Sequence, residues 1–335
     1  MQTVRLKDIA DACGVSTATV SRVLNGIDSR NKEQNALIQR TAKEMGYYPN
    51  AAARSLKTSR SNNIGILYED RLDHEYFSVL LDHLRRAADT RGYDLNLIGR
   101  ENGQYNDNYY EHTRRRNLDG VIVIQADFES PGIIQLASSN IPAVIIDHMY
   151  EGCDCVGSDN RASMEEIVRY AYERGHRRIA FITGQQGMVS QARNAGYYKA
   201  CAELGIRVKE GYVREGRYHD PDLCLQMIRE MLREEEAPTC ILCPDDYSCI
   251  GALWELKASG VDVPGDVSLI GYDGITIGRM VRPWLTTYRQ DAEGIAREAV
   301  DLLLEAVEDP ENHRPRLISL GGKMVEGETV KDFSR

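Results

Sequence analysis

Beyond residue 62, short apolar runs alternate with longer amphipathic stretches, and this alternation limits the fold more than any other feature of the chain. The apolar runs have the length of buried strands and occupy residues 64–69, 94–99, 120–125, 143–147, 178–183, 239–244 and 268–273. Helical periodicity marks the stretches between them, among them Tyr76–Thr90, Ala162–Arg174, Arg193–Leu204, Asp222–Glu234 and Tyr247–Ser259. Apolar strands separated by helices form parallel sheets covered on both faces. The sequence therefore predicts an α/β core with enough strands for two doubly wound parallel-sheet subdomains.

The first 46 residues have a different pattern, that of three short helices. One helix ends near Gly14, a second begins after Ser16, a good N-cap, and a third runs from about Lys32 to Met45. The expected inner faces are Leu6, Ile9 and Ala10, then Val20, Val23 and Leu24, then Ala36, Leu37, Thr41 and Met45. This pattern predicts a separate all-α unit in front of the α/β core.

Residues 7–25, KDIADACGVSTATVSRVLN, have the spacing of a helix-turn-helix. Gly14 permits the turn, Val15 follows it as an apolar plug, and Ala10 allows the two helices to approach closely. The second helix would then enter the major groove, where Arg22 can donate two hydrogen bonds to a guanine. The expected DNA contacts of this segment are Ser16, Thr17, Ala18, Thr19, Ser21, Arg22 and Asn25. Spacing alone also fits a helical hairpin that touches no DNA.

The same segment resembles the start of the lac repressor/galactose repressor (LacI/GalR) family, whose pattern is approximately hDVAxxAGVSxxTVSRVLN. A second family element, Y-x-P-N-x-x-A-R-x-L, has its counterpart in Tyr47–Leu56, and the resemblance continues over essentially the whole chain. It implies an operator-binding head followed by a hinge helix that orders on DNA and enters the minor groove. The residues that the resemblance places in this hinge contact are Asn50, Ala53 and Leu56.

Local physics agrees with a hinge that folds on its target. A helix of eight residues is too short to be stable alone. Leu56 would be the apolar wedge that opens a base step and bends the duplex. The chain departs from the family after the second helix, where Asn35 stands at a position that is commonly arginine, and this leaves the exact phosphate contacts open.

For the remainder, the resemblance implies a periplasmic-binding-protein-like core with a ligand cleft between its two subdomains, at the carboxyl ends of parallel strands. A hydroxyl-rich ligand there needs carboxylates, a guanidinium and a flat apolar face. The candidate effector-binding residues are Tyr76, Phe77, Asp147, Arg193, Tyr218, Asp245, Asp273 and Gln290. Each has a structural alternative, since a strand-end aspartate often caps the next helix and a lone aromatic side chain often belongs to the core.

Asp245 gives one indication of ligand chemistry. It stands where many relatives have asparagine, and a carboxylate can only accept hydrogen bonds. This favours a ligand with donors, such as sugar hydroxyls or an amine, and Glu69 near the same cleft would reinforce the preference.

We therefore expect three parts: a helix-turn-helix domain at 1–46, a hinge helix and linker at 47–62, and an effector-binding and dimerisation core at 63–335. Within the core, the N-subdomain should comprise about 63–158 plus 291–319, and the C-subdomain about 159–290 plus 320–333. The final residues show no leucine heptads, so a homodimer is expected, and its two-fold symmetry predicts an approximately palindromic operator.

Charge is distributed unevenly along the chain. Residues 1–60 hold ten Lys or Arg and five Asp or Glu, a net of +5, whereas the whole chain has −10, so residues 61–335 carry −15. Such a division suits a small part that meets a polyanion and a larger part that avoids one. No stretch resembles a membrane span or a secretory signal, which favours the cytoplasm.

The eight cysteines fit reduced thiols better than a metal site. Cys153 and Cys155 fall in an expected loop, and Cys240 and Cys243 fall in a strand-like run, with no second pair at zinc spacing. We expect no metal and no cofactor. Neither a dinucleotide-binding nor a phosphate-binding glycine motif is present, and no histidine lies in a recognisable nucleophile motif, so an enzyme is not expected.

The sequence thus predicts a DNA-binding transcriptional regulator, specifically a repressor controlled allosterically by a small effector, for which a carbohydrate is expected. The alternative is a family member controlled by a protein partner, or one that acts without a small-molecule effector. A free sugar-binding protein would share the core but not the DNA-binding head.

Overall fold

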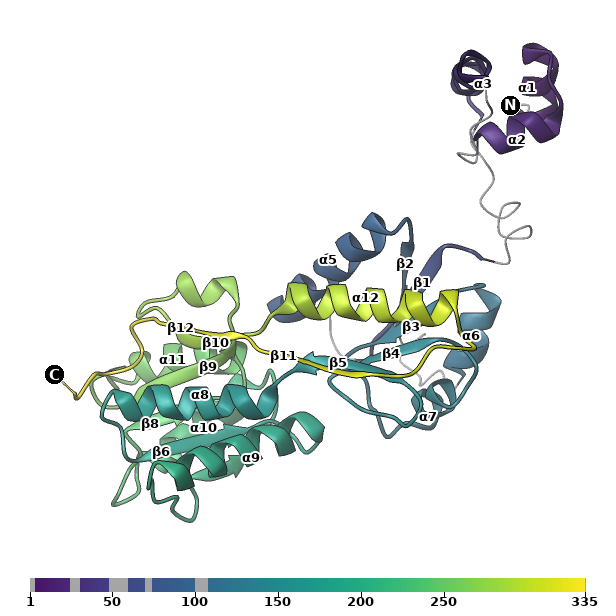
Figure 1. Ribbon diagram of the computed structural model, residues 1–335. Coiled ribbons are helices and arrows are strands. Elements are labelled where there is room, and N and C mark those ends of the chain that lie inside the picture. The colour runs from purple at the N-terminus through teal and green to yellow at the C-terminus, as the bar shows by residue number, and fades with distance from the viewer. Residues whose placement is uncertain (1–3, 25–30, 48–59, 70–73, 100–107, 335) are drawn as a thin grey trace. The chain divides into compact units, whose positions relative to one another are not determined.

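The computed structural model describes residues 4–24, 31–47, 60–69, 74–99 and 108–334 (Figure 1). The chain divides into two compact units, Met1–Asn62 and Asn63–Arg335. The predicted contacts Asn25, Asn50, Ala53 and Leu56 lie outside the described residues.

Three helices form the first unit: α1 (Leu6–Cys13), α2 (Thr17–Leu24) and α3 (Lys32–Glu44). Gly14 ends α1 in the left-handed conformation with φ 65°, and the backbone N–H of Val15 donates to the carbonyl of Ala10 at 3.0 Å. Ser16 caps α2, because its hydroxyl accepts a hydrogen bond from the backbone N–H of Thr19 at 3.2 Å. The predicted turn and cap between the two helices are confirmed.

The predicted inner face of α3 is wrong at Ala36 and Leu37, which are exposed, whereas Met45 packs against the core as predicted. The buried side chains are Asn35, Ile38 and Ala42, whereas Leu37 is 43% exposed. Neighbouring positions on a helix point about 100° apart, so the adjacent Leu37 and Ile38 cannot both face the core, and it is Ile38 that does. The buried polar side chain of Asn35 concealed the true spacing, because polar residues are usually expected outside. The same burial places Asn35 in the core of the unit and not on its surface.

The second unit contains two six-stranded sheets. The first has the strand order β11-β5-β4-β3-β1-β2 and is parallel throughout. Its strands are β1 (Asn63–Leu67), β2 (Asp94–Ile98), β3 (Gly120–Val123), β4 (Ala143–Ile146), β5 (Asp154–Ser158) and β11 (Leu317–Leu320). We call this sheet and its helices the N-subdomain.

The second sheet has the order β12-β10-β9-β8-β6-β7, and only the β10–β12 pair is antiparallel. Its strands are β6 (Ile179–Thr183), β7 (Val213–Glu215), β8 (Cys240–Leu242), β9 (Ser268–Asp273), β10 (Thr286–Arg289) and β12 (Lys323–Val325). We call this sheet and its helices the C-subdomain. The predicted doubly wound α/β core is confirmed.

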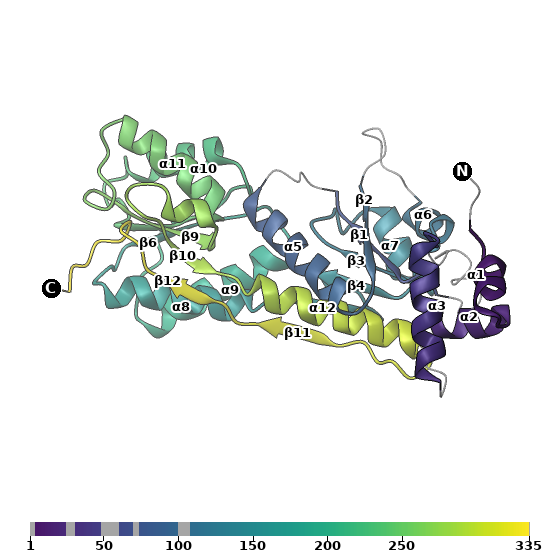
Figure 2. The ribbon, with the colours of Figure 1, turned by 90° about the horizontal axis from the view of Figure 1, so that it is seen from above.

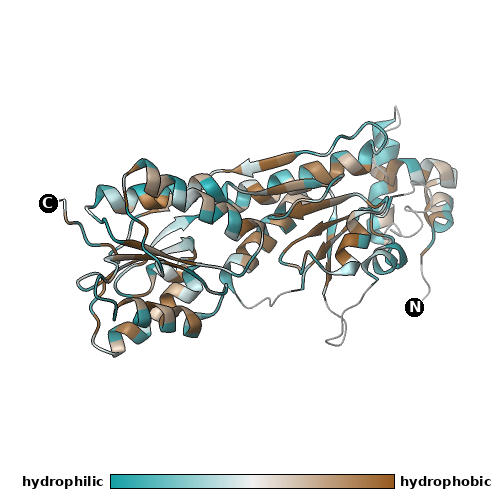
Figure 3. Ribbon diagram, turned by 90° about the horizontal axis from the view of Figure 1, so that it is seen from below, coloured by the Kyte–Doolittle hydropathy of each residue, from teal (hydrophilic) through white to brown (hydrophobic). Residues whose placement is uncertain are grey.

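Helices cover both faces of each sheet, and the apolar strands lie between them (Figures 2 and 3). The N-subdomain helices are α5 (Glu75–Thr90), α6 (Tyr109–Arg115), α7 (Pro131–Ala137) and α12 (Ala292–Glu308). The C-subdomain helices are α8 (Asn160–Glu173), α9 (Met188–Glu203), α10 (Pro221–Met231) and α11 (Asp246–Ala258), with a short 3₁₀ helix, η1 (Thr276–Arg279). None of the helices in the described residues is both long and apolar enough to cross a membrane.

All seven predicted strands are present, but five more were not expected. β5, with the sequence DCVGS, includes Cys155, so placing that cysteine in a loop was wrong. The strand begins with Asp154, which is only 2% exposed and accepts hydrogen bonds from His313 and from the backbone N–H of Arg316. A buried acid with tertiary partners breaks the apolar pattern by which strands are recognised.

The chain passes between the subdomains at three places, from β5 to α8, from β10 to α12 and from β11 to β12. Two of these crossings touch directly, since the backbone N–H of Asp159 donates to the carbonyl of Leu320 at 2.9 Å. The long yellow segment in Figure 1 shows the last passage beside both sheets. These crossings hold the two subdomains side by side, with the carboxyl ends of their strands facing a shared cleft.

Candidate functional site

A cavity of about 620 Å³ lies in this cleft. Residues that follow β1, β3 and β4 line it from the N-subdomain, and residues that follow β6 to β10 line it from the C-subdomain. Its size is within the range of small-molecule sites, and its place at the carboxyl ends of parallel strands is the usual one for ligands of such sheets. Seven of the eight predicted effector-binding residues line this cavity: Tyr76, Asp147, Arg193, Tyr218, Asp245, Asp273 and Gln290.

Backbone strain gathers around the cavity. Six residues other than glycine have a positive φ in the described parts of the chain. Four of the six line the cavity: Gln125 (44°), Asp147 (63°), His219 (56°) and Asp273 (114°). Such conformations cost energy and persist where surrounding contacts hold a side chain for binding or catalysis.

Arg193, in α9, is held rigidly although it is only 5% exposed. Its Nε donates to Oδ1 of Asn160 at 2.9 Å, and its Nη1 donates to the carbonyl of Pro244 at 2.9 Å. The guanidinium also lies 3.4 Å from the centroid of the Tyr272 ring. Nη2 has no hydrogen-bond partner among the described residues. The remaining donor edge is therefore available to a ligand in the cavity.

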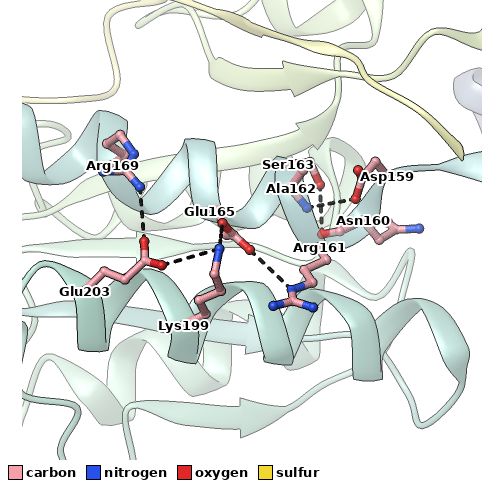
Figure 4. A network of polar contacts seen from close by, with 9 residues as sticks. All are labelled: Asp159, Asn160, Arg161, Ala162, Ser163, Glu165, Arg169, Lys199 and Glu203. Atoms are coloured by element: carbon pink, nitrogen blue, oxygen red, sulfur yellow. Dashed lines mark hydrogen bonds and ion pairs between the residues drawn. The ribbon is translucent and has the colours of Figure 1, made fainter.

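Polar contacts join α8 and α9, which carry Asn160 and Arg193 (Figure 4). Lys199 of α9 binds Glu165 and Glu203, while Arg161 and Arg169 of α8 bind the same two carboxylates. These pairs are partly exposed and contribute little stability individually. Together with the buried apolar contacts between the helices, among them Ile167 and Tyr197, they hold α9 in the position from which Arg193 reaches the cavity.

Asp147 and Asp273 approach Arg193 from opposite subdomains. Burial raises the pKa of Asp147 above its usual value, while Arg193 and the backbone N–H of Ser158 lower it. Burial also raises the pKa of Asp273 well above its usual value, and the nearby acids Asp245 and Asp246 raise it further. Since Arg193 offsets both effects only in part, each carboxyl gains from donors that a ligand brings.

Gln290 connects the two subdomains at the edge of the cavity. Its Oε1 accepts a hydrogen bond from the hydroxyl of Ser158, at the end of β5, and its Nε2 donates to Oδ1 of Asp273 at 2.7 Å. Both polar atoms of the side-chain amide are thus engaged within the protein. The geometry favours a role for Gln290 in orienting Asp273.

Tyr76 and Phe77, predicted as a pair, have different environments. The hydroxyl of Tyr76 is buried and has no hydrogen-bond partner among the described residues. Burial, together with Asp147 and Asp273, raises the pKa of Tyr76 well above its usual value, so this hydroxyl is a neutral donor. Phe77 is 1% exposed, packs against the Tyr68 ring and does not line the cavity, because consecutive helix residues point in different directions. Phe77 therefore lies in the core and not at the cavity, contrary to the prediction.

Tyr218 and Asp245 are positioned by the C-subdomain. The Tyr218 ring lies against Gly184, where a Cβ atom would come within 2.1 Å of the ring, and its hydroxyl is 2.9 Å from that of Ser190. Asp245 caps α11, since it accepts from the backbone N–H of Ser248 at 2.7 Å, and it also accepts from the backbone N–H of His219 at 2.9 Å. Asp245 thus caps a helix, which was the structural alternative considered for a strand-end aspartate. It also lines the cavity.

Sequence reasoning missed a set of contacts across the cleft. The rings of His74, from the N-subdomain, and His219, from the C-subdomain, stack at 3.9 Å between centroids, and Nε2 of His74 is 3.0 Å from Oε1 of Gln125. Also missed were Asp127, Phe128, Glu129 and His148, which line the N-subdomain side of the cavity. Gln125 ends a predicted strand run, so the strand-end rule could have found it, whereas the histidine pair depends on the approach of two subdomains.

The second candidate surface is the outer face of α2. Thr17, Ala18 and Arg22 are exposed there, and Thr19 and Ser21 are partly exposed. Val20 and Val23 point into the core of the unit, so the predicted contacts face away from it. Ser16 is exposed as well, although its hydroxyl is engaged as the helix cap.

Two family models match the chain. The model described as "Bacterial regulatory proteins, lacI family" covers residues 5–50, and the model of a "Periplasmic binding protein-like domain" covers residues 168–330. The HTH-type transcriptional repressor PurR of Escherichia coli O139:H28 is 30% identical over 334 residues, which is 98% of this chain and 97% of that protein. PurR of Pasteurella multocida is 28% identical over 331 residues, with 97% and 98% covered.

Solved structures show the same architecture. A complex of the transcriptional regulator CelR with cellobiose has a TM-score of 0.68 at 26% identity, over 97% of this chain and 99% of that one. The lac repressor dimer bound to operator and the anti-inducer ONPF has a TM-score of 0.81 at 24% identity, over 98% and 100%, a likeness that concerns the fold.

Proposed function

Because the chain belongs to the lacI family of bacterial regulatory proteins, we propose that it is a transcriptional repressor whose operator affinity is controlled by a carbohydrate bound in the cleft. One observation carries the proposal most directly. Arg193 is immobilised between carboxylates of the two subdomains, in a cavity where backbone strain is concentrated. The solved CelR complex, which shares this fold, contains cellobiose.

DNA is read by α2. We propose that Thr17, Ala18, Ser21 and Arg22 face the major groove and that Ser16, Thr19 and Asn25 contact phosphates. Asn50, Ala53 and Leu56 would act in the minor groove at the centre of the operator. A homodimer would present two such heads to successive major grooves, so the operator is an approximate palindrome.

An apolar surface on the C-subdomain supports the homodimer. Tyr247 and Trp254, seven residues apart on α11, are 48% and 70% exposed, and Met280, just beyond η1, is 72% exposed. Lys257 of α11 donates to the carbonyl of Arg282, which places the two segments side by side. Large apolar side chains gathered in this way are typical of a protein interface. The lac repressor that shares the fold is a dimer.

Control requires that the ligand favours one relative position of the subdomains. We propose that the two subdomains, about 63–158 plus 291–319 and about 159–290 plus 320–333, turn as rigid bodies around the three crossings. A ligand held by Asp147 on one side and Asp273 on the other would change its contacts with every such turn. Operator affinity and ligand affinity are then reciprocally coupled.

The test begins with the full chain and a pool of random DNA duplexes. Selection should recover an approximately palindromic site, and fluorescence anisotropy should then show that a neutral or amino sugar changes its affinity. Recovery of no preferred sequence would refute the DNA-binding assignment. A selected operator whose affinity responds to no sugar would leave a repressor controlled by a protein partner or by no effector. In this proposal the chain performs no catalytic step and acts in the cytoplasm, where its DNA lies.

A further inference from the structure

Acidic groups outnumber basic ones around the cavity. Six carboxylates line it: Glu69, Asp127, Glu129, Asp147, Asp245 and Asp273. Arg193 is the one arginine or lysine among its lining residues. Asp147 and Asp273 flank that guanidinium, and Asp245 is engaged in capping α11. Glu69, Asp127 and Glu129 remain, and we call these three residues the acidic edge.

The acidic edge is one connected piece of the N-subdomain. Glu69 follows β1 and accepts hydrogen bonds from the Tyr109 hydroxyl and from the backbone N–H of Asp127, both at 2.6 Å. Asp127 in turn accepts from the backbone N–H of Glu129 at 3.1 Å. Burial raises the pKa of Tyr150 to about 12, and the charges of these three carboxylates contribute to the increase. The Tyr150 hydroxyl is therefore close to all three. The three carboxylates are therefore near neighbours.

Aromatic rings lie beside this edge. The rings of Phe128 and His148 stack at 4.4 Å with an angle of 4° between them, and Tyr150 meets His148 edge-on at 4.7 Å. Phe128 and His148 both line the cavity. Burial lowers the pKa of His148, although Glu129 opposes this, so the imidazole is uncharged at neutral pH and does not balance the acidic edge.

This combination matches the hydrogen-bonding character of an ammonium group. Carboxylates accept and cannot donate, while an ammonium has three donors and no acceptor. Ring faces attract a cation as well. An anionic ligand would be repelled, and a neutral sugar that fills the cleft would remove water from carboxylates without supplying a charge in return.

We propose that the effector is an amine-bearing saccharide, with its positively charged amino group at the acidic edge against Phe128 and His148, and its hydroxyl groups at Asp147, Arg193 and Asp273. This rests on the proposed function, since it names the class of ligand for the same cleft. The Tyr76 hydroxyl, buried and without a partner among the described residues, would complete the hydroxyl-binding part.

The test compares chemical twins on the full chain. Isothermal titration at low and moderate salt would measure D-glucosamine against D-glucose, and the β-1,4-linked glucosamine disaccharide against cellobiose. We expect an amino probe to bind at least about tenfold more tightly than its neutral twin, and salt to reduce the difference.

Two double variants locate the effect. Asp127→Asn with Glu129→Gln removes two charges of the acidic edge at almost constant shape and should abolish the preference for the amine. Glu173→Gln with Asp222→Asn removes the same charge from exposed positions that do not line the cavity, and should preserve the preference. Thermal unfolding and operator binding of both variants would establish that they fold.

The inference fails if an amino probe binds no more tightly than its neutral twin, including the case in which neither binds. It fails equally if both double variants lose the preference to the same extent, because the overall negative charge would then explain it. Selection of an operator by the same preparation separates the two proposals. If neutral sugars release the chain from its operator, the repressor proposal stands and the amine-bearing effector is refuted. If no operator can be selected, the repressor proposal itself is refuted.

Discussion

The carboxylate of Glu75, at the start of α5, accepts a hydrogen bond from the backbone N–H of Thr276 at 2.5 Å, on the opposite side of the cleft. Its second oxygen accepts from the N–H of Ile277 at 3.1 Å, so one N-subdomain side chain caps η1 of the C-subdomain. Figure 2 shows α5 beginning beside the C-subdomain. Because this contact joins the two subdomains, we expect it to break when the cleft opens.

Glu75→Ala should favour the open cleft. The loss of charge-assisted bonds to two N–H groups should weaken effector binding by about fivefold, or ~1 kcal/mol for a partly exposed carboxylate. Small-angle scattering should show a larger radius of gyration for the variant without ligand. Glu75→Gln keeps one acceptor oxygen, so its effector affinity and its radius of gyration should lie between those of the parent chain and of Glu75→Ala. Unchanged affinity together with an unchanged radius would show that the contact does not hold the cleft.

Arg193→Ala should separate ligand response from DNA binding. The variant loses the donor edge in the cavity, so we expect effector affinity to fall by about 10- to 100-fold, while operator affinity without effector stays the same. Removal of the guanidinium also leaves Asn160 and the Pro244 carbonyl without this donor, so unfolding free energy should drop by ~1–3 kcal/mol.

Arg193→Lys is the informative companion, because it keeps the charge but not the planar fork. If it restored stability without restoring effector binding, the two donor edges of Arg193 would have distinct roles. Loss of operator binding by Arg193→Ala at permissive temperature would instead assign the residue to the fold.

Arg22→Ala should weaken operator binding by roughly 1–3 kcal/mol and relax the preference at one base pair of each half-site. The side chain is exposed on α2, so the thermal stability of the first unit should change little. Binding to a library of single-base operator variants would measure the preference. Equal weakening on every sequence would make Arg22 a phosphate contact.

His176 should make the free energy of unfolding depend on pH. Burial lowers the pKa of His176 to about 4, and its ring lies 2.9 Å from the Thr239 hydroxyl and 3.1 Å from the Lys331 carbonyl. Between its usual pKa of about 6.5 and this value, the unfolded chain binds a proton that the folded chain does not. Unfolding free energy should therefore fall as pH falls through this window, by up to about 1.4 kcal/mol per unit from this residue.

The measurement is urea unfolding between pH 7.5 and 4.5 for the parent chain and His176→Gln. Other groups titrate in both, so the difference between the two curves isolates the histidine. The parent should lose more stability on acidification than the variant, and parallel curves would show that His176 is not the source.

Local signals account for what the sequence could predict. Gly14 and Ser16 define the turn between α1 and α2 through their own backbone and hydroxyl chemistry, and both were predicted. Asp147 and Asp273 end apolar strands, so parallel-sheet geometry brings them to one cleft, and the family resemblance pointed to Arg193. The side on which a helix is buried depends on its neighbours, and for this reason Leu37 and Phe77 were misplaced.

The remaining features depend on distant partners. β5 begins with a buried acid whose partner His313 is far away in the sequence, and the stacking of His74 on His219 exists only because two sheets meet. Asp245 has two roles at once. It lines the cavity, and its carboxylate accepts hydrogen bonds from the backbone N–H groups of Ser248 and His219. No periodicity in the sequence could distinguish a ligand contact from a helix cap at that position.

The position of α12 and β11 has a consequence for synthesis on the ribosome. Both belong to the N-subdomain, yet they follow nearly the whole C-subdomain in the chain, and α12 buries its apolar face, including Ile295, Val300 and Leu303, against the first sheet. The N-subdomain therefore cannot complete its fold in the order of translation. Its core remains incomplete until residue 320 has emerged from the ribosome. While the C-subdomain is being made, the nascent N-subdomain exposes the apolar surface that α12 will cover, and such exposed surface favours aggregation.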